Sequence, residues 1–231
     1  EKFGNSFALM CVAWVLSGIL GLVLGIVAGY FKDRLPDRLI RGYALLLAST
    51  PAFWIGLLLL MIFAVWLGWL PFGMNLPAGM TAAEAGIGVR IWHLLLPALT
   101  LGLTGVANIT LHTREKMIAI MESDYVLFAR ARGESSGYIV KRHALRNLVL
   151  PAITLQFGSI SEIFGGSVLV EQVFSYPGLG QAAIDAGLGS DVSLLLAITV
   201  ISTLFVFLGN LVANVLYGVI DPQIRRGRSH G

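Results

Sequence analysis

Five long apolar runs dominate this sequence of 231 residues. A helix needs about 20 predominantly apolar residues to cross the hydrocarbon core of a bilayer, and each run is long enough. Strands would require a closed barrel with alternating polarity, and no such alternation is present. The chain is therefore predicted to be an all-α integral membrane protein with about five transmembrane helices. The runs occupy residues 7–31, 42–70, 91–113, 147–174 and 192–220.

Composition supports a membrane protein. Only 13% of the residues are charged and 56% are hydrophobic, whereas a soluble domain usually has about 25% charged residues. Cys11 is the one cysteine, which excludes an intrachain disulfide. Because Cys11 lies in an apolar run, it is expected to be a small buried thiol.

The connections between the runs differ in charge. Because Lys and Arg favour the cytoplasmic side, basic connections are predicted inside and the others outside. The N-terminus is then outside, which leads us to expect a further helix upstream of Glu1. The basic segments are 32–41, 114–146 and the tail with Arg225, Arg226 and Arg228. The predicted outer loops, at about 71–90 and 175–191, contain Arg90 as their one lysine or arginine.

Glycines recur along one face of the first run. Gly18, Gly21, Gly25 and Gly29 include two consecutive Gly-x-x-x-Gly spacings. Glycines at this spacing let a neighbouring backbone approach closely, which is a usual way for helices to associate in lipid. Tight packing within the bundle is the main prediction, and a functional hinge is the alternative.

Residues 114–146 form the longest polar segment, called here the basic loop. Asp124 is expected to cap a short helix that runs to Arg132, and Gly133 is expected to end it. On that helix Tyr125, Phe128, Ala129 and Arg132 are spaced by three and four residues and are predicted to share a face suited to a groove on another protein. A second short helix is expected over residues 137–146. The alternative is a basic surface loop that rests on anionic lipid.

Glu162 is the most informative charge inside an apolar run. A carboxylate there costs about 2.5–3.5 kcal/mol on insertion scales, and such residues usually face a bundle interior or water. Glu162 and the nearby Ser159 are therefore predicted to line a translocation path, with a structural hydrogen bond as the alternative. Asn108 lies deep in the third run, where it either bonds a neighbouring helix or contacts cargo.

Other polar residues have simpler predicted roles. His93 is expected to be solvated or hydrogen-bonded near the outer interface. Glu171 is expected to contact the outer loop or an outer partner, or to be solvated. Asn210 and Asn214, four residues apart, are expected to form interhelical hydrogen bonds.

Two stretches at the basic loop resemble the coupling motif of binding-protein-dependent ABC importer permeases, in the branch that carries dipeptides, oligopeptides and nickel. The first is Asp-Tyr-x-x-x-Ala-Arg-Ala-Arg-Gly over residues 124–133. The second runs from Arg142 to Asn147 and continues to Leu150-Pro151. The resemblance covers nearly the whole chain, because it also includes residues 47–54, 67–71, 165–166, 171, 173–174, 177–180 and 221–225.

The resemblance implies a type I ABC importer permease fold, with six helices in the full-length protein and a cytoplasmic coupling helix. Its implied partners are a second homologous permease, two cytoplasmic ATPases and an extracytoplasmic substrate-binding protein, and its implied location is the cytoplasmic membrane of a bacterium or archaeon. No Gly-x-x-x-x-Gly-Lys-[Ser/Thr] phosphate loop occurs in residues 1–231, which are expected to form one permease domain. ATP and Mg are therefore expected on the partners, and this chain is predicted to be neither an enzyme nor a cofactor carrier.

The resemblance also assigns roles within the basic loop. The small residues Ala129, Ala131 and Gly133 would allow close approach of the ATPase. Tyr125 and Phe128 would fill its groove. His143 and Arg146 would brace the loop. The remaining members of the predicted coupling set are Asp124, Arg132 and Asn147.

Two departures from the family pattern are present. Arg130 separates Ala129 from Ala131, where the general motif has paired alanines, and the gap from Gly133 to Pro151 is long. The second departure is that the N-terminal helix and outer segment of the branch are not found in residues 1–231, which leads us to expect further sequence upstream of Glu1. Both the long gap and the separated alanines are expected of this branch.

The cargo remains open between nickel, a metal chelate and short peptides. Nickel-transporting members of the branch carry an acidic residue where Glu162 stands, which favours a metal cargo. No close His or Cys cluster is present, which fits a weakly binding path for either cargo. A secondary transporter driven by an ion gradient is the alternative function, although no convincing internal repeat supports it. A membrane-embedded enzyme would need convergent catalytic groups that the sequence lacks.

Overall fold

The computed structural model describes residues 1–77, 79–80 and 84–220, with the backbone alone for Leu150 and residues 216–220. Every regular element in these ranges is a helix. The predicted basic tail, with Asp221-Pro222 and its arginines, lies outside the described residues. In chain order the elements are α1 (Lys2–Tyr30), α2 (Leu35–Ser49), α3 (Ala52–Leu59), the π-helix η1 (Leu60–Trp66), α4 (Ile87–Met121), α5 (Asp124–Ala131), α6 (Ser136–Ile139), the π-helix η2 (Val140–Ala144), α7 (Leu145–Gly158), α8 (Ile160–Val173), α9 (Leu179–Leu188) and α10 (Val192–Ile220).

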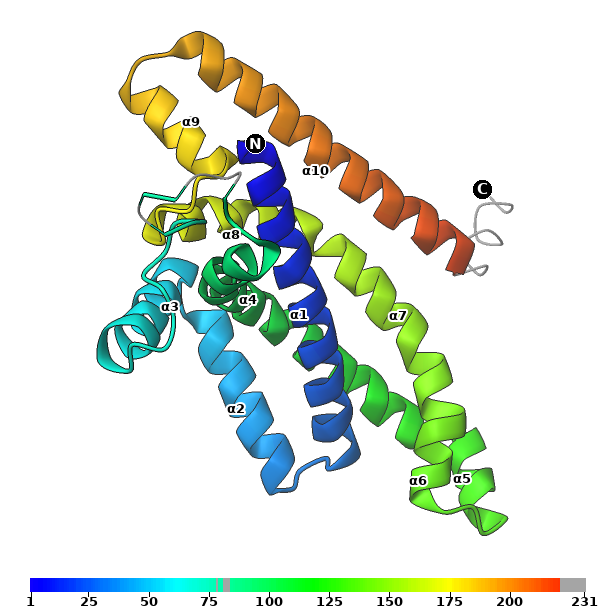
Figure 1. The fold of residues 1–231 in the computed structure, drawn as a ribbon. Coiled ribbons are helices and arrows are strands. Elements are labelled where there is room, and N and C mark those ends of the chain that lie inside the picture. Colours follow the sequence, from blue (N-terminus) through cyan, green and yellow to red (C-terminus); the bar gives the residue numbers. More distant parts are fainter. Residues whose placement is uncertain (78, 81–83, 221–231) are drawn as a thin grey trace.

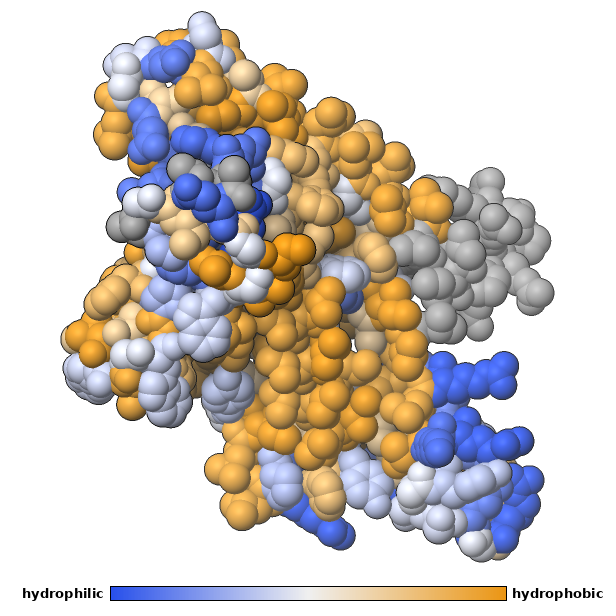
Figure 2. Space-filling view, in the orientation of Figure 1, coloured by the Kyte–Doolittle hydropathy of each residue, from blue (hydrophilic) through white to orange (hydrophobic). Residues whose placement is uncertain are grey.

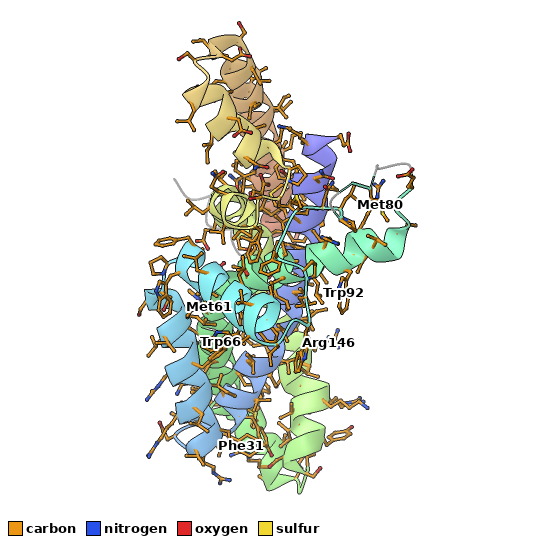
Figure 3. All side chains as sticks on the ribbon, turned by 60° about the vertical axis from the view of Figure 1, so that its left-hand side comes forward. Phe31, Met61, Trp66, Met80, Trp92 and Arg146 are labelled. Atoms are coloured by element: carbon orange, nitrogen blue, oxygen red, sulfur yellow. The ribbon has the colours of Figure 1, made fainter. Side chains whose placement is uncertain are left out.

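The molecule has two polar ends and an apolar middle (Figure 2). The α1–α2 turn lies toward the same end as α5 and α6, whereas α9 and the start of α1 lie at the other end (Figure 1). Phe31, in the α1–α2 turn, and Met80 are correspondingly far apart in Figure 3. Three described helices, α1, α4 and α10, are long and apolar enough to cross a membrane, and two bent pairs raise the total to as many as five. The predicted all-α membrane fold is confirmed.

The second apolar run is broken, so the prediction of one helix over 42–70 was wrong. The helix begins earlier, at Leu35, and α3 with η1 leaves α2 at 109° after Ser49. Pro51 has no amide hydrogen to donate, and it disfavours helical geometry at Thr50, whose backbone is extended. Figure 3 labels Met61 and Trp66 on η1, which continues α3 away from the direction of α2.

The fourth run is also bent. The predicted single helix over 147–174 is two helices, α7 and α8, that meet at Ser159 with an angle of 47°. The Ser159 hydroxyl donates to the Gln156 carbonyl at 2.8 Å, which is the kind of side-chain bond that bends helices. Residues 137–146 are helical as predicted, but they do not form a separate helix, because α6, η2 and α7 follow one another without a break into the membrane.

The glycines of α1 lie against its neighbours. A Cβ atom built on Gly25 would lie 2.5 Å from the Thr113 Cβ, and one on Gly29 would lie 2.5 Å from the Met117 Cβ. α1 and α4 make the most extensive contact of any two described helices. The absence of side chains therefore sets how closely these helices approach. Of the other two glycines, Gly21 lies against Ile109 and Gly18 lies against Gln156.

A matched pair of glycine substitutions tests this packing. Gly25→Ala is expected to lower the unfolding temperature in detergent because overpacking costs about 1–3 kcal/mol. Gly42→Ala in α2, where an added Cβ meets no atom within 4 Å, is expected to be neutral or slightly stabilising. Equal thermal stability of the two variants would show that the close α1–α4 approach is not required.

Candidate functional site

α5 lies at the basic end of the molecule, at the far end of α4 from the α9 region (Figure 1). The prediction that Asp124 caps it was wrong: the cap position is Ser123, no side chain bonds the first amides, and Asp124 is the first helical residue. The Ser123 hydroxyl instead donates to the Ile120 carbonyl at 2.5 Å. Asp124 still places a negative charge in the first turn, where it interacts favourably with the positive end of the helix dipole.

Gly133 ends α5 as predicted. Its φ of +84° lies in the left-handed region, which glycine adopts without strain. The Gly133 amide donates to the Arg130 carbonyl at 2.9 Å, and the Glu134 amide donates to the Ala129 carbonyl at 3.1 Å. The chain thus reverses tightly toward α6.

The two sides of α5 differ. Ala129 is buried with Val126 and Ile139 against the last turn of α4. It is therefore not part of the predicted docking face, whereas Tyr125, Phe128 and Arg132 are exposed. Phe128 is 71% exposed and Leu127 is 66% exposed. The α5 surface is defined here as five of the exposed residues of this helix and its end: Tyr125, Leu127, Phe128, Ala131 and Arg132.

A brace holds the turn that follows α5. Glu134 accepts hydrogen bonds from Arg132 at 2.8 Å and from His143 Nε2 at 3.0 Å. Asn147 Nδ2 donates to the Tyr125 hydroxyl at 3.2 Å, which joins α7 to α5. Arg146 is exposed and forms no hydrogen bond with a described residue. Sequence reasoning missed Glu134, although an acidic residue between the two basic stretches was a signal for it.

Two ion pairs, also missed, tie the α1–α2 turn to α4. Asp37 is fully buried in the first turn of α2 and accepts two bonds from Arg114, at 2.5 Å from Nε and 2.7 Å from Nη2. Lys32 pairs with Glu122 at the end of α4. The hydrogen bond from Lys32 to Glu122 raises the pKa of the lysine above its ordinary value. α5 therefore begins two residues after Glu122, which the ion pair with Lys32 holds in place.

A polar pocket of about 330 Å³ collects the residues predicted for a path. Asn108 comes from α4, Ser159 from the α7–α8 bend and Glu162 from the first turn of α8. The sequence positions of these residues did not predict that they line one pocket, because this arrangement depends on the bend and on the packing of three helices. The pocket is completed by Thr154, Leu155, Gly158, Ala213 and Asn214.

Glu171 at the other end is a structural acid. It is fully buried, and its carboxyl group accepts bonds from the Ser6 hydroxyl at 2.5 Å and the Gly180 amide at 2.8 Å. The predicted contact with the outer loop is confirmed and the solvated alternative is wrong. A Cβ on Gly178 would overlap the Glu171 carboxyl group, so this glycine makes room for it. Burial and the nearby Glu171 raise the pKa of Tyr176 to about 12.

The remaining polar predictions have definite outcomes. His93 is buried rather than solvated, and its Nδ1 lies 3.0 Å from the Gly73 carbonyl oxygen. Asn210 accepts a hydrogen bond from Ser161 at 3.0 Å, which confirms the interhelical bond. Asn214 is exposed toward the polar pocket instead. Cys11 is exposed, so the prediction of a buried thiol was wrong; it lines an apolar groove between α1 and α10.

These features describe a multi-pass helical membrane protein with a polar pocket among its helices and a structured basic end. The family model described as binding-protein-dependent transport system inner membrane component matches residues 21–226, and the chain belongs to this family. It is thus a permease subunit of a binding-protein-dependent ABC importer, and the predicted family is confirmed.

Curated relatives lie in the peptide-importing part of the family. The oligopeptide transport system permease protein AppB of Bacillus subtilis is 37% identical over 227 residues, which are 96% of this chain and 70% of AppB. The glutathione transport system permease protein GsiC of Escherichia coli K12 is 36% identical over 226 residues, or 97% of this chain and 69% of GsiC.

A solved structure supports the same fold. A chain of the MetNI methionine ABC transporter, in an inward-facing conformation, matches with a TM-score of 0.73 at 14% sequence identity. The match covers 95% of this chain and 94% of that chain. The type I ABC importer permease fold is therefore confirmed.

Proposed function

We propose that this permease subunit imports short peptides and receives the force of ATP hydrolysis through its α5 surface. The peptide cargo is supported by the printed substrates of AppB and GsiC, which are oligopeptides and glutathione. Nickel or a metal chelate is the alternative that Glu162 suggested, and the described residues contain no group of three potential metal ligands.

The observation that carries the docking proposal is the composition and position of α5. Phe128 and Leu127 are mostly exposed at a polar, basic end of the molecule, where a lone helix would gain nothing from exposed aromatic surface. Val126 and Ala129 of α5 pack against the last turn of α4, and the Glu134–His143 contact joins the turn after α5 to η2. Movement of a docked partner would therefore be passed to a membrane-spanning helix rather than absorbed by a loose loop.

The proposed assembly has two permeases, two cytoplasmic ATPases and an outer binding protein. The second permease is a distinct homologous chain in this proposal, because the branch that the sequence resembles normally pairs two. ATP and Mg bind to the ATPases. The path within this chain is the polar pocket, with Glu162, Ser159 and Asn108 on its wall.

Uptake by the purified assembly in proteoliposomes tests the cargo and the energy source together. We expect ATP-dependent accumulation of labelled tri-alanine that requires the binding protein, and no accumulation of nickel above the level without ATP. Uptake driven by an ion gradient without ATP would contradict the importer mechanism. Uptake of nickel in place of peptide would contradict the peptide cargo alone.

A further inference from the structure

We propose that Glu162 selects cargo by charge, and that its carboxylate receives the side-chain ammonium group of a basic peptide as it passes the polar pocket. The inference rests on the proposed peptide import and adds a specificity-determining residue to it. The inference requires that Glu162 have no partner within the chain and that the pocket favour cations. It also requires that the site lie at the bend between α7 and α8.

Glu162 differs from Asp37 and Glu171, two other acidic residues in helices that form candidate membrane spans. Asp37 is fully buried and paired with Arg114. Glu171 is fully buried and bonded to Ser6 and to the first turn of α9. Glu162 is exposed and forms no hydrogen bond with any described residue. A carboxylate in a spanning helix is too costly to face lipid without a partner, so it faces water, a partner chain or cargo.

The lining of the polar pocket favours a cation. Glu162 is its one charged residue, and none of the other lining residues is basic. Asn108 and Asn214 are exposed and can donate to or accept from peptide groups, since each amide has both functions. An ammonium group brings three donors, which a carboxylate and amide oxygens can accept. A single carboxylate binds such a group weakly enough to release it, as a path requires.

The position of Glu162 couples selection to a bend. It lies in the first turn of α8, directly after the 47° break at Ser159. Asn108 of α4 and Asn214 of α10 line the same pocket, and neither helix is part of the bent pair. A change in the angle between α7 and α8 would move the carboxylate relative to both amides. The ammonium site would then form in one conformation and open in another.

Peptides of opposite charge test the inference. Ala-Lys-Ala and Ala-Glu-Ala are supplied to the reconstituted assembly with saturating binding protein, and the maximal uptake rate is normalised to the fraction of binding protein that each peptide loads. In the wild type we expect Ala-Lys-Ala to be imported several-fold faster. A hydrogen bond to a charged group contributes about 1.5–3 kcal/mol, so Glu162→Gln is expected to lower Ala-Lys-Ala uptake by about 10-fold or more and to bring the ratio of the two rates close to one.

Controls separate charge selection from a structural role. Glu162→Asp is expected to keep the preference for Ala-Lys-Ala, whereas Asp185→Asn, at an exposed residue of α9, is expected to change neither rate. Elution of the whole assembly on size exclusion is expected to be unchanged in Glu162→Gln, which would show that the substitution leaves the complex intact. Equal loss for both peptides, loss of the assembly, or unchanged rates would overturn the inference while peptide import stands. If the wild type imports neither peptide, the peptide cargo itself is contradicted.

Discussion

Replacement of Phe128 by alanine is expected to reduce ATP-driven uptake by about 30-fold or more and to leave the chain folded and inserted. Phe128 is 71% exposed, so its truncation removes little packing within this chain. An aromatic anchor at the centre of an interface typically contributes about 2 kcal/mol or more to binding. The loss should therefore be seen in uptake and in cargo-stimulated ATP hydrolysis, measured on the same proteoliposomes.

Leu35→Ala is the matched control for Phe128→Ala. Leu35 is 70% exposed and lies at the same end of the molecule, at the start of α2. Its truncation removes similar exposed apolar surface without touching α5, so uptake should be retained. Ala131→Glu, which adds bulk and charge to the α5 surface, should abolish uptake, a larger loss than that expected for Phe128→Ala. Normal uptake in both α5 variants would contradict a docking role for this helix.

Replacement of Glu171 by leucine is expected to give the largest loss of stability. It leaves the Ser6 hydroxyl and the Gly180 amide without an acceptor in a buried site. Each unsatisfied buried group costs about 1–3 kcal/mol, so the total is about 3 kcal/mol or more. For a chain of this size about 3 kcal/mol corresponds to a decrease of roughly 6–12 °C in the unfolding temperature. Thermal unfolding of the purified permease in detergent measures it.

Two variants accompany Glu171→Leu. Glu171→Gln keeps the size of the side chain and an oxygen that can accept from the α9 amides, so its loss should be clearly smaller. Gln172→Leu changes the adjacent exposed residue and should leave the unfolding temperature within about 2 °C, as surface substitutions are usually neutral. If Glu171→Leu is as stable as Gln172→Leu, the carboxyl group is not holding α1, α8 and α9 together.

The fold was largely predictable because its main determinant is local. The length of each apolar run and the charge of each connection are properties of neighbouring residues, and they gave the helical class and the approximate spans. The breaks were not predictable in the same way. A run of apolar residues has the same composition whether it is straight or turns by 109° after Ser49, and only Pro51 signalled the turn.

The candidate site was predictable only in part because it is assembled from distant segments. Glu162 was identified because a carboxylate in an apolar run is costly wherever it lies. Its meeting with Asn214 of α10 follows from tertiary packing, for which no local pattern exists. The same limit applies to Glu134, whose contact with His143 depends on how tightly the chain reverses at Gly133. Ala129 was predicted on the exposed side of α5. Residue spacing shows which residues share a helix face, but it does not show which face packs against the rest of the protein.

Cross-linking from α5 tests the central claim most directly. In a chain with Cys11→Ser, which removes the only other thiol, Arg130→Cys at an exposed position of α5 is labelled with a short photoactivatable cross-linker and the whole assembly is reconstituted. The proposed mechanism predicts a cross-linked product between this chain and an ATPase subunit, with a yield that changes between nucleotide-free and ATP-bound states. Cross-links to lipid alone, in an assembly that still imports peptide at the normal rate, would contradict it.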